Sequence, residues 1–182
     1  MGNSNTTNAR RVHYRRITCI VWCNNAGVIT RGNITEITDD EYDLTMKVNV
    51  EAPFRLCRAS IPLMKKGSVI VNISSCWGLR PGPNHPLYVM SKAAIGSLTQ
   101  CLGIDHAHQG IRVNAVCPGL IDTEMVRDTI SRETVKNFEK SFPISRLGSP
   151  GEVASLVGFL LSDNASYITG AAIDINGGDF LA

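Results

Sequence analysis

The sequence lacks the features that mark a membrane-spanning, secreted or metal-binding protein. It contains no run of about eighteen apolar residues, which argues against a transmembrane helix. Its N-terminus does not show the positive-then-apolar order of a secretory signal. The six cysteines and four histidines show no metal-ligand spacing, and scattered cysteines usually behave as small buried residues in a reducing compartment. We therefore expect a cytoplasmic protein with no membrane or metal partner.

Acidic residues are absent from the first sixteen positions. This segment holds four arginines, a net charge of +4 in a chain whose total charge is +2. Arginines without periodicity indicate a solvated, disordered terminus more than a nucleic-acid-binding tail. Gly2 and Thr6 fit the short N-myristoylation pattern, but one acyl chain anchors weakly. We expect a basic segment at residues 1–16, one globular domain at residues 17–182, and no nucleic-acid partner.

The stretch from residue 69 to 92 carries the densest functional signals. Residues 69–73 form a short apolar run rich in β-branched side chains, which predicts a buried parallel strand. A loop rich in glycine and proline follows, and a long helical pattern begins just before Tyr88. Tyr88 and Lys92 stand four positions apart, so both side chains project from one face of this helix. Ser75 follows the strand, at the end where open α/β sheets bind ligands.

A tyrosine, a lysine and a serine in this arrangement can move a proton. The pKa of a free tyrosine is about 10, too high for efficient proton transfer near neutral pH. A neighbouring lysine cation favours the phenolate and lowers that pKa. A serine hydroxyl can donate to the substrate oxygen, so the trio suits interconversion of an alcohol and a carbonyl with a cofactor carrying the hydride. Ordinary helices also contain such tyrosine–lysine pairs, so the pair alone does not decide.

Several motifs in a fixed order make the sequence resemble the short-chain dehydrogenase/reductase family. Residues 24–27 look like the family's NNAG signature, and Asn49 matches the asparagine of its catalytic tetrad. Ser75 stands thirteen positions before Tyr88, which is the family spacing, and Tyr88-x-x-x-Lys92 is its YxxxK signature. The segment Pro118, Gly119, Ile121 and Thr123 looks like the one that holds the nicotinamide carboxamide. The resemblance covers roughly residues 17–176.

The resemblance implies a role for each matched residue. Tyr88 would be the general acid/base, and Ser75 would polarise the substrate oxygen. Lys92 would lower the tyrosine pKa and bind the nicotinamide ribose, and Asn49 would hold a water of a proton relay. The implied cofactor contacts come from Asn24, Ala26, Gly27, Tyr88, Lys92, Pro118, Gly119, Ile121 and Thr123. The cofactor would be NAD or NADP, the substrate a small molecule with a hydroxyl or keto group, and the assembly a homo-oligomer.

The glycine-rich TGxxxGxG turn that begins the family fold is missing from this sequence. NNAG occurs at residue 24, which leaves no room for the two preceding βαβ units of about 30 residues each. We therefore expect an α/β fold, a Rossmann-like doubly wound parallel sheet that is incomplete because the first three family strands are missing. The adenosine half of the cofactor site would be absent. The apolar run at residues 17–23 would become an exposed sheet edge, which favours self-association.

The remaining patterns complete a β-α-β-α-β-α-β order. Apolar runs predict strands at residues 17–23, 69–73, 111–117 and 171–175. Helical patterns cover residues 38–65 and 87–110, a short piece at 132–140, and a segment that starts at Ser149. Pro53 should bend the first helix or restart it near Asn49. Otherwise, Asn49 is merely a poor helix former on an exposed face.

Two functions remain open at this point. The first is an NAD(P)-dependent oxidoreductase that uses the Ser-Tyr-Lys-Asn proton relay. The second is a truncated, non-catalytic fragment that at best associates with other subunits, because losing remote cofactor contacts depresses rate as well as affinity. A lyase or epimerase of the same superfamily is a third choice. The short ending Asn176-Gly177-Gly178 favours the dehydrogenase-rich branch over it.

Overall fold

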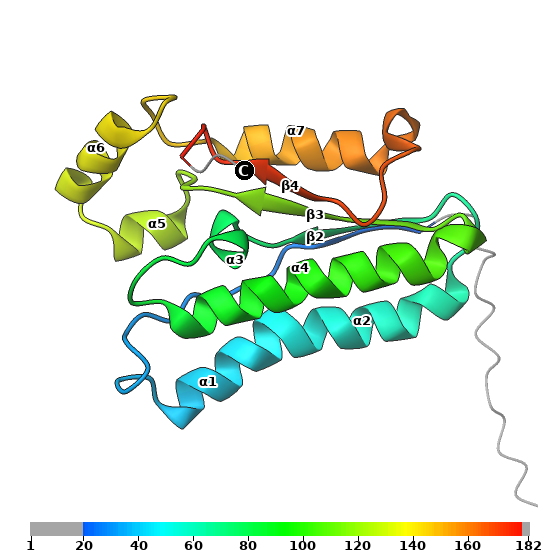
Figure 1. Ribbon diagram of the computed structural model, residues 1–182, viewed down its shortest axis with the longest axis horizontal. Coiled ribbons are helices and arrows are strands. Elements are labelled where there is room, and N and C mark those ends of the chain that lie inside the picture. The colour runs from blue at the N-terminus through cyan, green and yellow to red at the C-terminus, as the bar shows by residue number, and fades with distance from the viewer. Residues whose placement is uncertain (1–19, 180–182) are drawn as a thin grey trace, which may run out of the picture.

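The computed structural model describes residues 20–179, which form one parallel sheet with helices on both faces. The strands lie in the order β1 (Val21–Asn24), β2 (Val69–Ile73), β3 (Arg112–Pro118) and β4 (Ala172–Ile175). Helices α2 and α4 lie along one face and α7 along the other (Figure 1). This confirms the predicted doubly wound α/β fold, and four parallel strands fit the incomplete sheet that we expected.

The helices follow the predicted order, with one addition in each of two loops. Their bounds are α1 (Asp39–Met46), α2 (Ala52–Ser60), α3 (Cys76–Leu79), α4 (Pro86–His106), α5 (Glu124–Thr129), α6 (Arg132–Ser141) and α7 (Pro150–Leu161). Short 3-10 turns occupy Ile61–Leu63, Ala107–Gln109 and Asp163–Ala165. Helices α3 and α5 correct the sequence interpretation, which treated both stretches as loop. Each is too short to show a helical period.

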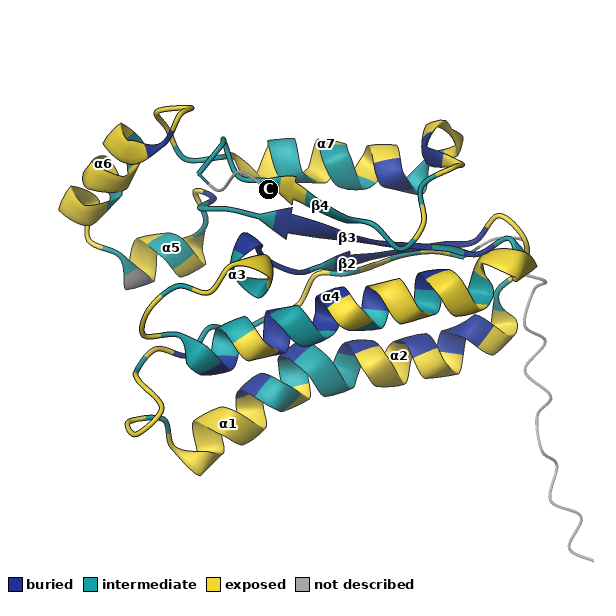
Figure 2. Ribbon diagram, in the orientation of Figure 1, coloured by how far each residue is buried: buried dark blue, intermediate teal, exposed yellow. Residues whose placement is uncertain are grey.

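Within residues 20–179, the two central strands are buried and the first strand lies at one edge of the sheet. Ile70 of β2 and Val113 of β3 are fully covered, whereas Val21 of β1 is 56% exposed. Figure 2 shows that β2 and β3 are largely buried, whereas the surrounding helices also carry exposed residues. The first residues of the expected strand 17–23, like the basic segment 1–16, lie outside the described residues.

The expected irregularity near Asn49 is a π-helical turn. Residues Lys47–Glu51 form this turn between α1 and α2, and Pro53 lies in the first turn of α2. Proline has no N–H for the carbonyl four positions earlier, and its ring crowds that carbonyl. That carbonyl belongs to Asn49. The sequence therefore predicted both the place and the cause of the widened turn.

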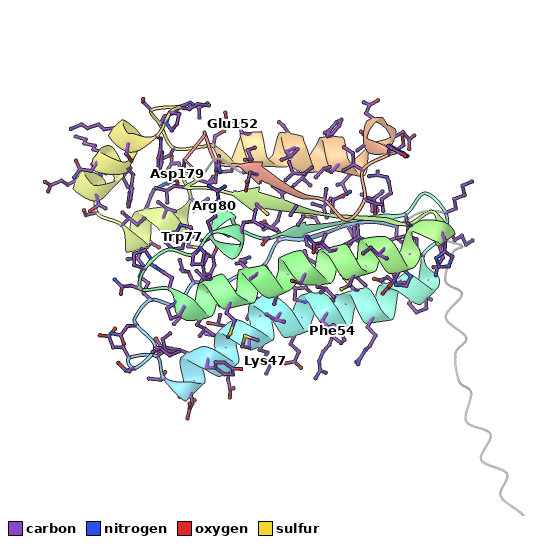
Figure 3. The ribbon with its side chains drawn as sticks, viewed as in Figure 1. Lys47, Phe54, Trp77, Arg80, Glu152 and Asp179 are labelled. Carbon is purple, nitrogen blue, oxygen red and sulfur yellow. The ribbon has the colours of Figure 1, made fainter. Side chains whose placement is uncertain are left out.

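Two apolar clusters fix the helices to the sheet. On the α2 and α4 side, Cys57, Ile70 and Ile111 belong to one buried cluster. On the α7 side, Val71 and Leu160 belong to the other. Phe54 projects from α2 away from the sheet (Figure 3). Across residues 20–179, no helix is long and apolar enough to cross a membrane, and no group of three or more ligating side chains is placed to hold a metal ion.

Candidate active site

The predicted motifs meet at the carboxyl end of the sheet. Gly27 follows β1, and a Cβ atom placed on it would lie 3.3 Å from Lys92 Nζ and 3.5 Å from Asn49 Oδ1. Gly78 of α3 lies closer still to α4, because a Cβ there would lie 2.8 Å from the Lys92 carbonyl carbon. A side chain at residue 78 would therefore collide with the backbone of α4, and one at residue 27 would press on Lys92 Nζ. The NNAG segment, the π-helical turn and the YxxxK helix therefore come together.

Ser75 lies between the end of β2 and helix α4. It is the N-cap of α3, and its Oγ accepts a hydrogen bond from the backbone N of Trp77 at 3.2 Å. Its hydroxyl also acts on the phenol of Tyr88, whose pKa it lowers. The Trp77 ring packs edge-on against the Tyr88 ring, with 6.4 Å between the ring centres. The structure thus brings the predicted serine and tyrosine to the same site.

The pKa of Tyr88 corrects one prediction. Burial raises it above its ordinary value, and Ser75 opposes this only in part. We expected the Lys92 cation to lower this pKa. Lys92 Nζ lies 5.8 Å from the centre of the Tyr88 ring, so its attraction for a phenolate does not overcome desolvation.

Lys92 is a buried cation held by the end of β2. Its side chain is 5% exposed, and Nζ donates a hydrogen bond to the Ile73 carbonyl at 2.9 Å. Burial lowers the pKa of Lys92 to about 8. A buried ammonium on a helix face one turn from a half-buried phenol is rarely a purely structural arrangement, because strongly shifted groups cluster at functional sites.

Asn49 is buried, which rules out the alternative of an exposed helix face. It is 1% exposed, and its Oδ1 accepts from the backbone N of Val28 at 2.9 Å. Its Nδ2 donates to the Val28 carbonyl at 2.8 Å and to Ser91 Oγ at 3.0 Å. Both amide protons are therefore used to tie the segment after NNAG to helix α4.

The residues expected to contact the cofactor differ in their exposure and in their contacts within the fold. The Asn24 side chain stabilises the sheet: its Nδ2 donates to Asn72 Oδ1 at 2.7 Å, and its Oδ1 accepts from Trp22 Nε1 at 2.6 Å. Ala26 is exposed next to it. Gly119 lies against β4, since a Cβ there would lie 2.8 Å from Asn176 Cα. The cofactor roles of these residues stay predictions.

The segment beyond β3 lines a small cavity. Ile121 is 9% exposed and pairs with Gly148 through an isolated bridge. The cavity beside it has a volume of about 110 Å³, and Phe142 and Asn176 also line it. Thr123 Oγ1 donates to the Ile121 carbonyl at 3.4 Å. This places the predicted residues Ile121 and Thr123 at the same end of the sheet as Pro118.

Sequence reasoning missed two buried serines that hold helix α4. Ser74 Oγ donates to the Lys92 carbonyl at 2.8 Å, and Ser91 Oγ donates to the Tyr88 carbonyl at 2.8 Å. Ser91 is fully buried and Ser74 is 3% exposed. A serine beside apolar positions in a core-facing helix pattern was the available signal.

A family described as enoyl-(acyl carrier protein) reductase matches residues 5–179. An uncharacterized oxidoreductase of Thermotoga maritima is 43% identical over 162 residues, covering 85% of this chain and 64% of the relative. This chain belongs to the short-chain dehydrogenase/reductase family. L-xylulose reductase of Caenorhabditis elegans is 42% identical over 160 residues, covering 85% of this chain and 63% of that protein.

Solved structures of short-chain dehydrogenases share the fold. A short-chain dehydrogenase family protein from Francisella tularensis superposes with a TM-score of 0.82 at 35% identity, covering 89% of this chain and 70% of that one. A blue fluorescent protein from a metagenomic library, solved with NADPH, gives 0.82 at 36% identity, covering 87% and 64%. The family membership predicted from the motifs is confirmed. The chain spans 64% of the length of the first curated relatives it matches.

Proposed function

We propose that this chain carries the proton-transfer site of an NAD(P)-dependent oxidoreductase that interconverts an alcohol and a ketone. The observation that carries the proposal is the buried Lys92, whose Nζ lies 5.8 Å from the centre of the Tyr88 ring, at the strand end that also carries Ser75. Oxidoreductases and a reductase among the relatives support it. The NADPH complex of a structural neighbour supports the choice of cofactor class.

Tyr88 is the residue that transfers the proton. Because burial raises its pKa, the phenol stays neutral near pH 7, the form that donates a proton to a carbonyl oxygen during reduction. Ser75 donates a second hydrogen bond to the same oxygen and orients it. In the reverse direction Tyr88 must accept a proton, so oxidation of an alcohol is expected to need a higher pH than reduction of a ketone.

The described residues fit the nicotinamide half of a dinucleotide. Gly27 leaves open the space beside Lys92 Nζ that a side chain would fill. Lys92 and the segments 24–27 and 118–123 would hold the cofactor, which supplies or accepts the hydride when bound.

Asn49 has a narrower role than the relay asparagine that we expected. Both amide protons of its side chain already bind Val28 and Ser91. A relay water at Asn49 must therefore bind to its Oδ1 or to its backbone carbonyl, the group that Pro53 leaves without its usual helical donor.

A non-catalytic role is the second candidate. The exposed edge of β1 favours a chain that associates with other subunits. Titrating the purified chain with NADH and with NADPH, followed by fluorescence, separates the two candidates. Saturable binding and ketone reduction support the oxidoreductase. No binding at millimolar nucleotide in a folded sample supports the non-catalytic role.

A further inference from the structure

The hydroxyl of Ser91 connects two residues of the proposed relay. Its Oγ accepts a hydrogen bond from Asn49 Nδ2 at 3.0 Å and donates to the backbone carbonyl of Tyr88 at 2.8 Å. Ser91 is fully buried, so water cannot replace either bond without a structural change. One hydroxyl thereby links the π-helical turn to the backbone of the proposed acid/base.

The position of Tyr88 in its helix makes this link important. Tyr88 is the third residue of α4, which begins at Pro86. The first turn of a helix lacks the preceding carbonyls that hold later turns, and helix ends fray. Backbone drift in this turn would carry the phenol away from Ser75. The bridge from Asn49 through Ser91 limits that drift from the side of the π-helical turn.

Ser74 holds the next turn in the same way. Its Oγ donates to the Lys92 carbonyl, and its backbone N donates to the Val116 carbonyl at 2.8 Å. The carbonyls of both reactive helix residues therefore accept hydrogen bonds from buried serine hydroxyls. Productive site geometry must be held within about 0.5 Å, which requires supporting contacts of this kind.

Helix α4 also contains a matched bridge away from the site. Thr99 is fully buried, its Oγ1 donates to the Ile95 carbonyl at 2.8 Å, and it accepts from Asn72 Nδ2 at 2.9 Å. Both bridges thus join a buried asparagine amide, a buried hydroxyl and a carbonyl of α4. They differ in place, because Thr99 lies in the middle of the helix, where neighbouring turns already fix the backbone.

We propose that Ser91 is a positioning residue for the reaction, and that the Asn49–Ser91–Tyr88 bridge sets the distance between the Tyr88 phenol and Ser75. Ser91 does not touch the reacting atoms. It acts through Tyr88, whereas the equivalent bridge at Thr99 only stabilises the fold. The inference rests on the proposed function for its effect on turnover, but its effect on Tyr88 can be measured without turnover.

The test compares Ser91→Ala with Thr99→Val in the full chain. Each variant removes one buried hydroxyl, so both should lower the Tm to a similar extent. With a small ketone that the unaltered chain reduces and saturating NADPH or NADH, Ser91→Ala should lower kcat about tenfold with KM changed less than about twofold, as expected for misplaced acid/base geometry. Thr99→Val should leave kcat within about twofold of the unaltered chain.

A titration of Tyr88 provides the second readout. With the chain's four tyrosines labelled with ¹³C at Cζ, Tyr88→Phe assigns the Tyr88 signal. Ser75 lowers the pKa of Tyr88, so moving the phenol away from Ser75 should raise that pKa in Ser91→Ala and not in Thr99→Val. Equal titrations in the two variants would overturn the inference, even if the unaltered chain reduces ketones. If the unaltered chain turns over no ketone, the proposed function fails, and this titration still decides the role of Ser91.

A second variant protects the test against misfolding. Ser91→Cys keeps the volume of the side chain with a weaker donor and acceptor. It should show the same direction of change in the Tyr88 titration at a smaller size. An unchanged Tyr88 titration in folded Ser91→Cys and Ser91→Ala would show that the bridge is only structural.

Discussion

The first half of helix α4, residues 86–92, differs from the second half, residues 95–103, in what its buried atoms do. In the second half, Ile95 and Gly103 fit closely against the rest of the fold, and a Cβ on Gly103 would lie 2.6 Å from the backbone of Gly170. In the first half, burial covers a phenol and an ammonium and moves both pKa values against their charged forms.

The two halves differ in whether they bury ionisable side chains, which costs free energy. Burying an ionisable group disfavours its charged form, and such a cost persists where the group has a chemical task. The second half of α4 carries no comparable cost. Changes to the Tyr88 phenol should therefore alter chemistry with little loss of stability, and changes to the packed positions of the second half should do the reverse.

Tyr88→Phe should give the largest effect. Removing the phenolic hydroxyl removes the proposed proton donor, so ketone reduction should fall by roughly 10³-fold. The thermal midpoint should change little, because the ring still packs against Trp77. Steady-state kinetics and a melting curve on the same sample measure both. An active Tyr88→Phe protein would remove the assignment of Tyr88 as acid/base.

Lys92→Met should remove a pH dependence of stability. The pKa of Lys92 is lowered from 10.5 to about 8, so between these values the unfolded chain binds more protons than the folded chain. Stability should therefore rise with pH across this window, by about 3 kcal/mol from this residue. Lys92→Met should lose that rise.

The buried thiols titrate in the opposite sense. Burial raises the pKa of Cys117 to about 11 and that of Cys76 to about 12. The folded chain therefore loses stability as the pH rises above 9, because the unfolded chain releases these protons first. The difference between Lys92→Met and the unaltered chain in urea unfolding from pH 7 to 10 isolates the lysine. Parallel pH curves for the two proteins would contradict a buried, shifted Lys92.

Gly103→Ala tests the second half of the helix. The added methyl would meet the Gly170 backbone at 2.6 Å, so we expect a loss of about 2 kcal/mol in the free energy of unfolding. Gly96→Ala is the matched control, because a Cβ there meets nothing within 4 Å, and alanine should stabilise the helix by about 0.5–1 kcal/mol. Urea unfolding separates them, and equal stabilities would contradict the packing described for Gly103.

The smallest effect on the fold is expected at the sheet edge. Val21 of β1 is 56% exposed, and an uncovered apolar edge strand favours pairing with another chain. Val21→Lys should reduce self-association while changing the free energy of unfolding by less than about 0.5 kcal/mol. Sedimentation velocity at several concentrations measures this. Self-association of equal strength in both proteins would show that β1 does not mediate it.

Much of the fold could be predicted from short-range features of the sequence. The apolar run of β2 lies where predicted, and a capping box of Thr38 and Glu41 begins the first helix at the predicted position. The second capping box, at Ser149 and Glu152, also begins its helix as expected. Pro53 marked the irregular turn. These features depend on neighbours in the chain, so the sequence contains their causes.

The features that the sequence did not reveal depend on distant neighbours. Helix α3 was hidden because four residues cannot show a period. The direction of the Tyr88 pKa shift depends on how deeply the folded chain buries the phenol, which no spacing encodes. Ser91 gave only the weak signal of one hydroxyl in a helix, and its partner Asn49 is 42 positions away.

Hydride transfer tests the central claim most directly. The unaltered chain and Tyr88→Phe are each incubated with a panel of small ketones and with NADPH or NADH deuterated at both C4 positions, and the products are analysed by mass spectrometry. The account predicts deuterium on the former carbonyl carbon with the unaltered chain and almost none with Tyr88→Phe. Equal transfer by the two proteins would contradict the role of Tyr88, and no transfer by the unaltered chain with either nucleotide would contradict the proposed oxidoreductase.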